Sequence, residues 1–137
     1  MKPKRAVIKE ELIAITDDAT EALILNCLVN ETLISIRLDE LIMAERKRAD
    51  SIGKNITMTL TKGWFYKRAE DIAKEIMIID SVQTIRKKLS ALIEKNFVEE
   101  KCSDEYKFEK TRMYRVNFNA LEKALVDKGY TLNVIFL

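Results

Sequence analysis

Along residues 64–118 the apolar positions alternate between strand spacing and helix spacing. WFYK reads as a short strand at 64–67, and AEDIAKEI predicts a helix over 69–76 with an apolar inner face. Residues 77–79 form a turn before the next helix, VQTIRKKLSALIEK, over 82–95. The apolar residues of that helix recur at i, i+3, i+7, i+10 and i+11, so they predict a single stripe against a core.

Two segments with strand alternation follow, FVEEKCS and TRMYRVNF, and the polar stretch DEYKFEK at 104–110 joins them. Asp80 or Ser81 can cap the helix that precedes them, and Asn96 suits the left-handed position after its last turn. Strand, helix, turn, basic helix and two-stranded ribbon, in this order, are typical of a winged helix-turn-helix. We therefore expect an α+β fold in which 104–110 forms the wing.

The N-terminal part predicts an extension of this module. Residues 6–15 look extended, a helix capped within 16–18 runs to about Leu33, and a second helix covers 37–52. The first of these helices is apolar on more than one side, which favours a place at the centre of the core. A dimer interface is the alternative use of the same apolar surface.

Two shorter elements complete the expected fold. ITMTL at 56–60 alternates as a strand and turns back through 61–63, and Asn117 or Asn119 can cap a final helix over 120–129. The apolar residues after that helix look extended. The sequence thus predicts one winged-helix domain of 137 residues, with an N-terminal extension at 1–55, a core at 56–118, and a C-terminal helix and tail at 119–137.

The composition predicts an ordered protein that is not an enzyme. Its 47% hydrophobic and 34% charged residues are typical of a globular domain. Two cysteines without any histidine indicate reduced thiols and no zinc site. The three glycines form neither a phosphate-binding loop nor a nucleophile elbow. We therefore expect no catalytic residue, no cofactor and no metal.

The chain also lacks the sequence signals of membrane proteins. No apolar run approaches the ~18 residues that a membrane span needs. The basic start MKPKRAVIKEEL is interrupted by two glutamates before a signal-peptide core can form. We therefore expect a cytoplasmic protein without a membrane partner.

The net charge of +2 is weak evidence for nucleic-acid binding, so the placement of the charges has to decide. Residues 1–61 hold 9 Lys and Arg against 10 Asp and Glu, and residues 62–116 hold 13 against 10. The excess of cations is small, but it falls on the segment with the helix-turn-helix pattern.

On the helix over 82–95 the apolar stripe fixes which side faces outward. The outward set, with Arg86 at its flank, comprises Ser81, Gln83, Thr84, Arg86, Lys87 and Lys88. Gln pairs with adenine, Lys reaches guanine O6 and N7, and short hydroxyls adapt to either base. The N-terminal half of a second helix meets base edges in helix-turn-helix docking. A solvated lysine-rich face is the alternative for the helix alone, but the turn before it and the ribbon after it favour DNA.

The predicted wing mixes both signs of charge. We expect Lys107 and Lys110 near its tip to contact phosphates, which carries no sequence information. Arg112 and Arg115 fall on opposite faces of a regular strand, so only one of them can point to DNA, and Arg112 is our candidate. Trp64 and Tyr66 are expected to anchor the ribbon to the core.

Several of these segments resemble a known family. GWFYKRAEDIAKEI, SVQTIRKKLSALIEKNFVEE, YKFEKTRMYRVNFNALEKAL and the opening IAITDDATEALILNCLVNET are similar to winged-helix replication proteins of phages and integrative elements of Gram-positive bacteria. These proteins are replisome organisers or replication initiators, akin to the N-terminal domain of primosomal DnaD proteins. The resemblance spans nearly the whole chain, and the GWFYK turn and the YKFEKTRMYRVN wing are its more distinctive parts.

The resemblance implies binding of double-stranded DNA at an origin and recruitment of replication proteins such as a helicase or helicase loader. It also implies self-association as a homodimer or higher oligomer. It carries the DNA-contacting role onto Gln83, Thr84, Lys87 and Lys88, and the wing onto Lys107 and Lys110.

Two other functions stay open for the same sequence. One is a transcriptional regulator with a winged helix, and the other is a protein-interaction module whose winged helix does not bind DNA. The near-neutral charge and the acidic wing residues favour the second modestly. Members of the family often continue into a second region that contacts DNA or helicase machinery, so a fragment, a shortened version and a regulator on the same module are all consistent with a chain that stops at Leu137.

Overall fold

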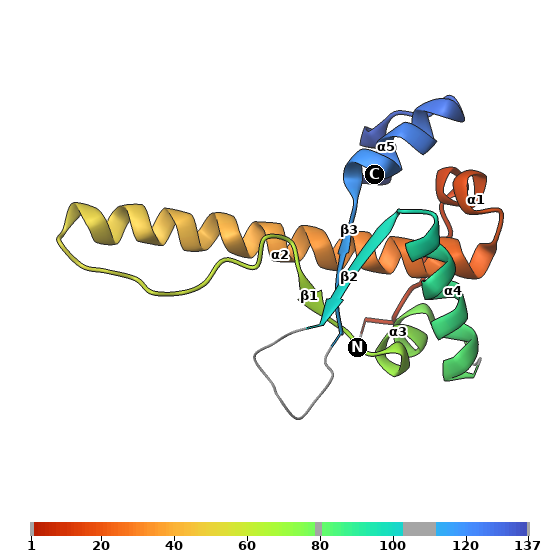
Figure 1. Ribbon diagram of the computed structural model, residues 1–137, viewed down its shortest axis with the longest axis horizontal. Helices are drawn as coiled ribbons and strands as arrows, with labels where there is room; N and C mark the ends of the chain where they lie inside the picture. Colours follow the sequence, from red (N-terminus) through yellow and green to blue (C-terminus); the bar gives the residue numbers. More distant parts are fainter. Residues whose placement is uncertain (1, 79–80, 103–111, 137) are drawn as a thin grey trace.

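The computed structural model describes residues 2–78, 81–102 and 112–136 (Figure 1). Within these ranges the chain forms five α-helices, one short 3₁₀ helix and a three-stranded antiparallel sheet. The fold class is therefore α+β, as the sequence predicts.

The first helix, α1 (Glu10–Thr16), occupies most of the segment 6–15 that was expected to be extended, so that prediction is wrong. Leu12 on its inner side is fully buried in the core. A segment this short shows too little periodicity to distinguish a helix from a strand, because either can present one apolar side chain to a core.

A tight turn joins α1 to the longest helix, α2 (Ala19–Ser51). Asp17 ends α1 in the left-handed conformation, with φ of 56°. The carboxylate of Asp18 then accepts a hydrogen bond from the backbone N–H of Glu21 at 2.9 Å. This bond satisfies one of the unpaired N–H groups at the start of α2, and it confirms the cap predicted within 16–18.

The two helices predicted up to Leu33 and over 37–52 are one continuous helix, so the predicted break is wrong. The apolar pattern does change there, because residues 22–29 are buried on all sides whereas the distal half of α2 is buried on one side only. This change marks where the helix leaves the core, and the backbone continues unbroken. In Figure 1 the N-terminal half of α2 passes behind the sheet and the distal half projects away from the rest of the chain. The expectation that the first helix lies at the centre of the core is confirmed.

By length and composition alone, α2 could cross a membrane, because it contains an 18-residue window of mean hydropathy 1.3. Of that window, 61% is buried inside the fold. A helix at the centre of a protein core meets the same criterion. Burial in this fold accounts for the apolar character of the window.

After α2 the chain returns along the helix to the sheet (Figure 1). Residues 56–60 lie in the described part of the chain and form no strand there, so the strand predicted for them is wrong. Their alternation suits an extended backbone, but a strand also needs a partner with which to exchange hydrogen bonds. Bonds to α2 hold this return segment: the carboxylate of Asp39 accepts from the backbone N–H groups of Thr61 at 2.6 Å and Lys62 at 2.7 Å.

The next elements follow the predicted order closely. Strand β1 (Phe65–Tyr66) leads to α3 (Ala69–Ile76) and then to α4 (Val82–Glu94). Met77 ends α3 with φ of 57°. The predictions of these three elements are confirmed. Both helices show an apolar face at helical spacing, and α4 also has its side-chain cap at Ser81.

The sheet combines β1 with β2 (Val98–Cys102) and β3 (Arg112–Val116). Its strand order is β1-β3-β2, so β3 lies in the middle and pairs antiparallel with both neighbours. Asn96, with φ of 66°, turns the chain from α4 into β2, as predicted. The predicted wing at 104–110 lies outside the described residues.

The C-terminal helix, α5 (Phe118–Asp127), is capped by Asn117, whose side chain accepts from the N–H of Ala120 at 3.2 Å. The tail after it forms a 3₁₀ helix, η1 (Leu132–Phe136), so the prediction of an extended tail is wrong. The chain turns back at residue 130, where the backbone N–H bonds to the carbonyl of Leu125 at 2.9 Å, and the tail then packs against the core.

One apolar cluster joins all of these elements. The N-terminal half of α2 runs through it, and the inner faces of the other helices and of the sheet surround that half. Ile85 and Leu92 of α4 are fully buried, as the predicted stripe requires. The stripe therefore fixes the rotation of α4 about its axis, which decides which of its polar residues reach the surface.

Candidate nucleic-acid interface

The outward face of α4 lies opposite its buried stripe. Gln83 and Lys87 are exposed there, one turn apart, in the N-terminal half of the helix. Arg86 is exposed on the flank nearer to α3. These three residues lie where the sequence places them, and together they offer an amide and two cations at the surface.

Ser81 and Thr84 form the hydrogen bonds that cap the first turn of α4. The Ser81 hydroxyl oxygen accepts from the backbone N–H of Thr84 at 3.2 Å, and the two hydroxyl oxygens are 2.9 Å apart. Ser81 is therefore the N-cap of α4, as predicted. Both hydroxyls lie at the end of the helix next to Gln83, and Thr84 is half-buried.

Lys88 lies on the inner flank of α4, so its predicted place on the outward face is wrong. Its ammonium is hydrogen-bonded to the Asp18 carboxylate at the start of α2, and its side chain is half-buried. Lys88 directly precedes the buried Leu89, so it lies at the edge of the apolar stripe. A side chain at that edge contacts the neighbouring element, which here is the start of α2. Here the hydrogen bond with Lys88 holds the pKa of Asp18 below its ordinary value.

Lys95, the residue that directly follows α4, makes a similar contact with α2. Its ammonium donates to the Glu21 carboxylate at 2.7 Å and to the Thr16 carbonyl at 3.0 Å. Glu21 is almost fully buried. Two lysines on one flank thus join α4 to the first turn of α2 and its cap.

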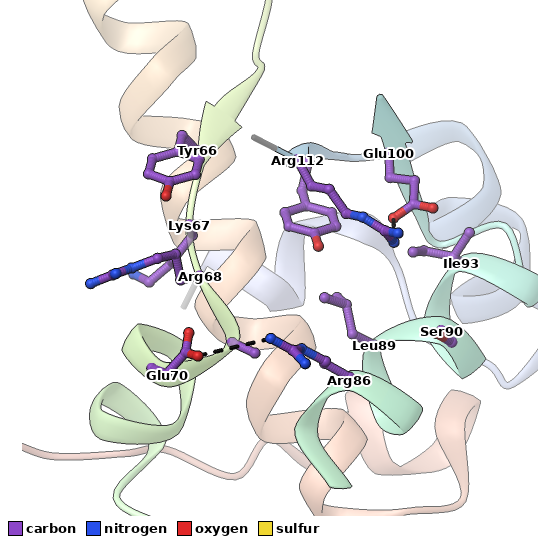
Figure 2. A pocket seen from close by; sticks show the side chains of 12 residues that line it. Tyr66, Lys67, Arg68, Glu70, Arg86, Leu89, Ser90, Ile93, Glu100 and Arg112 are labelled. Carbon is purple, nitrogen blue, oxygen red and sulfur yellow. Dashed lines mark hydrogen bonds and ion pairs between the residues drawn. The ribbon is translucent and has the colours of Figure 1, made fainter. Parts of the chain in front are cut away.

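On the opposite flank, a groove of about 590 Å³ lies between α4, the sheet and the start of α3. Its lining residues are Tyr66, Lys67, Arg68, Ala69, Glu70, Arg86, Leu89, Ser90, Ile93, Glu100, Arg112 and Tyr114. Figure 2 shows Arg112 beside Glu100 on the sheet side and Arg86 reaching toward Glu70 across the gap between α4 and α3. Its buried lining residues are Lys67, Leu89 and Tyr114, and its exposed rim carries both signs of charge.

The ion pairs of this rim are long and exposed. Arg86 lies 3.9 Å from Glu70, Arg112 lies 3.4 Å from Glu100, and the three arginines of the groove have side chains 63–65% exposed. Exposed pairs of this kind contribute about 0–1 kcal/mol. The cations can therefore exchange these carboxylates for another anion at little cost.

The other face of the sheet carries a separate cluster around Trp64. The guanidinium of Arg115 lies 4.4 Å and the ammonium of Lys101 4.5 Å from the centre of the Trp64 ring. Arg115 also donates to Glu99 at 2.7 Å. Arg112 and Arg115 thus lie on opposite faces, as predicted, and Arg112 is the one on the side of α4.

Two further predictions on this surface have different outcomes. Trp64 contacts Lys101 of β2 and Arg115 of β3, and its expected packing against the core stays a prediction. Tyr66 is 51% exposed and lines the groove, so its expected place against the core is wrong. Lys107 and Lys110 lie outside the described residues, and their phosphate contacts stay predictions.

The structure adds three residues that the sequence analysis did not place at this groove. Ser90 lines the groove one turn after Arg86, and the helical period of α4 could have identified it. Tyr66, the last residue of β1, and Arg68, directly before α3, line the same groove. No local pattern assigns them to it, because the groove exists only once the sheet packs beside α4.

Lys67 has a different role from its neighbours, although it follows Tyr66 directly. Its side chain is only 8% exposed, and its ammonium bonds to Glu31 of α2 at 3.0 Å and to Glu75 of α3. Burial lowers the pKa of Lys67, but the two carboxylates raise it by more, so the ammonium keeps its proton. Lys67 therefore fastens the start of α3 to α2.

Cys27 belongs to the same buried cluster. Its thiol donates to the Glu75 carboxylate across 2.9 Å. Burial, together with this bond, raises the pKa of Cys27 to about 12. The thiol stays protonated at neutral pH, so it acts here as a hydrogen-bond donor between α2 and α3.

Comparisons of the chain with protein-family models, with curated protein sequences and with solved structures found no match. The functional argument therefore rests on the geometry of α4, the groove and the sheet.

Proposed function

We propose that this chain is a winged-helix DNA-binding protein in which α3 and α4 form the helix-turn-helix and β2 and β3 form the ribbon of the wing. The order of the elements supports the assignment: α2, β1, α3, α4, β2 and β3 follow one another, and β1 pairs with β3 at the sheet edge away from β2. In this arrangement α4 is the helix that enters the major groove.

One observation carries the proposal. The outward face of α4 presents Gln83 and Lys87 from its N-terminal half, beside a groove whose rim carries Arg86 and Arg112. Amide and ammonium groups are suited to base edges, and guanidinium groups are suited to phosphates. A surface with Gln83 and Lys87 placed for base edges, and with exposed arginines beside them for phosphates, fits a DNA duplex.

The weakness of the rim ion pairs fits this role. In the unbound protein, Glu70 and Glu100 lie close to Arg86 and Arg112. A phosphate offers a guanidinium a stronger, bidentate partner than an exposed carboxylate at 3.4 Å or 3.9 Å. Binding then exchanges intramolecular partners for the phosphates on either side of the major groove.

The biological role is proposed from the family resemblance. We propose that the protein acts in replication initiation of a phage or mobile element, binding an origin and recruiting a helicase or helicase loader. A transcriptional regulator would use the same surface, and the position of the preferred site separates the two roles. Repeated sites at an origin support replication, and single sites at promoters support regulation.

Binding of the purified chain to duplex fragments from its own genome, over a salt series, tests the proposal. We expect selective binding whose log K falls linearly with log salt, by about 0.9 for each phosphate contacted. Binding that is absent even at low salt would overturn the proposal and favour the protein-interaction module. A pulldown with the candidate helicase or loader then tests the partner separately.

A further inference from the structure

The distal half of α2 carries a row of exposed apolar side chains. Ile34 is 62% exposed, Leu38 45%, and Leu41 59%, and Ile52 directly after the helix is 65% exposed. Large apolar residues scattered singly on a surface are ordinary, but a row on one side of a projecting helix indicates an interface.

The row follows a heptad spacing. Counting from Ile34, alternating steps of four and three residues reach Leu38, Leu41, Glu45, Arg48 and Ile52. Positions spaced in this way form one seam along a helix, and two helices pack by interlocking such seams. The seam of α2 is thus apolar toward both ends and charged in the middle.

The rest of this chain does not cover the seam in the described residues. The return segment lies on another side of α2, where its Thr61 hydroxyl donates to the carbonyl of Ser35 at 3.1 Å and its backbone bonds to Asp39. Ile42 on that side is 5% exposed, whereas Leu41 beside it faces outward. The side of α2 away from the return segment is therefore the side available to a partner.

The two charges select the partner and its direction. Glu45 and Arg48 lie three residues apart in the seam and pair with each other at 2.6 Å. In a parallel pair of identical helices, Glu45 would face Glu45 and Arg48 would face Arg48, which is unfavourable. In an antiparallel pair centred between these residues, each Glu45 faces the Arg48 of the other copy, and each Leu41 faces the other Ile52. Ile34 and Leu38 lie beyond this overlap, because α2 ends at Ser51.

We infer that the distal half of α2 binds a second copy of this chain as an antiparallel two-helix seam. A rise of 1.5 Å per residue puts the two folded bodies at opposite ends of the joined helices, on the order of 60 Å apart. The inference concerns self-association alone, and it holds whether or not α4 binds DNA.

The mass of the particle in solution tests the seam. We expect the native chain to have twice the mass of its 15.9 kDa monomer in light scattering. Leu41→Lys should give the monomer mass. The matched control is Met43→Lys, because Met43 is exposed to a similar extent, 57%, but lies outside the seam. A monomeric native chain, or equal loss of the dimer in both variants, overturns the inference.

A charge exchange tests the pairing of Glu45 with Arg48. Glu45→Arg and Arg48→Glu should each be monomeric alone, because like charges then face one another in the seam. Mixing the two variants should restore a dimer, because the two seam cations of the Glu45→Arg copy then face the two seam carboxylates of the Arg48→Glu copy. Circular dichroism confirms that each variant keeps its helices. A mixture that stays monomeric contradicts the pairing between copies.

The direction of the two helices is tested by cross-linking in a Cys102→Ser background, which removes the exposed native thiol. One copy carries Leu41→Cys and the other Ile52→Cys. Under mild oxidation we expect the mixed pair to cross-link far faster than Leu41→Cys with itself. Faster cross-linking of Leu41→Cys with itself would indicate a parallel pair and overturn the antiparallel arrangement.

Discussion

The two flanks of α4 carry the same kind of side chain and use it differently. On the inner flank, Lys88 bonds to Asp18 and Lys95 bonds to Glu21 at the start of α2. The side chains of both pairs are partly or almost fully buried. On the outer side, Lys87 is exposed, and Arg86 has only a distant partner at 3.9 Å. The same charge therefore supports the fold on one flank and is available to a ligand on the other.

The difference comes from the position of each residue relative to the buried stripe. Cations beside the stripe are held against α2, where partners in a less polar setting interact strongly. Cations opposite the stripe stay in water, where each contributes little to stability. Substitutions on each side of the stripe test this difference.

The largest effect is expected from the stripe that separates the flanks. Leu92→Ala removes a fully buried side chain, and it should lower the free energy of unfolding by about 2–5 kcal/mol in a urea titration. The matched control is Val126→Ala on α5, which is 57% exposed and should change stability by less than about 0.5 kcal/mol. Equal effects would mean that α4 is not held by this stripe.

The second-largest loss of stability is expected from a substitution on the inner flank. Lys95→Ala leaves the almost fully buried Glu21 carboxylate without its ammonium partner, so we expect a loss of about 1–3 kcal/mol in the same titration. Lys87→Ala, on the same helix, should stay within about 0.5 kcal/mol of the native protein. If both substitutions lower the free energy of unfolding equally, the two flanks do not differ in the way described above.

The outer face should show the reverse result in DNA binding. Lys87→Ala should weaken binding by roughly 1–3 kcal/mol if the ammonium reads a base edge, measured by fluorescence anisotropy on a labelled duplex. Lys123→Ala on α5 removes the same charge from an exposed site outside the proposed interface. An unchanged affinity in Lys87→Ala, or an equal loss in both variants, would remove Lys87 from the site.

The smallest effect concerns pH. The hydrogen bond with Lys88 lowers the pKa of Asp18 from its ordinary value of 3.8. A lowered pKa in the folded state stabilises the protein at pH above the unfolded value, and that stability is lost as pH falls through the folded value. Lys88→Met should therefore flatten the fall in stability below pH 3.8, whereas Lys87→Met should leave the profile unchanged. Parallel profiles for the two variants would contradict the assignment.

The elements that the sequence predicted well have a clear period and chemical signals at their ends. The helix of α4 has a stripe of five apolar positions, the Ser81 cap before it and Asn96 after it, and all three features recur in the structure. The elements that the sequence did not predict lack either a clear period or a chemical signal at their ends. The segment 56–60 alternates like a strand, but its pairing partner is not encoded locally.

The candidate site was predictable to a similar degree. Gln83, Arg86 and Lys87 could be placed outward from the helical period alone. The contact of Lys88 with Asp18 could not be predicted, because the helical period does not show which residue of another element lies beside Lys88. Lys107 and Lys110 lie outside the described residues and stay predictions.

By itself, the sequence determined the local elements between residues 65 and 127 and the buried face of α4, because side-chain period and capping chemistry act over a few residues. Three further features follow from tertiary packing: α2 is one helix, Lys88 faces α2, and Tyr66 and Arg68 share a groove with Arg112. These outcomes depend on contacts between residues far apart in the chain. Such contacts form only when the core places their elements side by side.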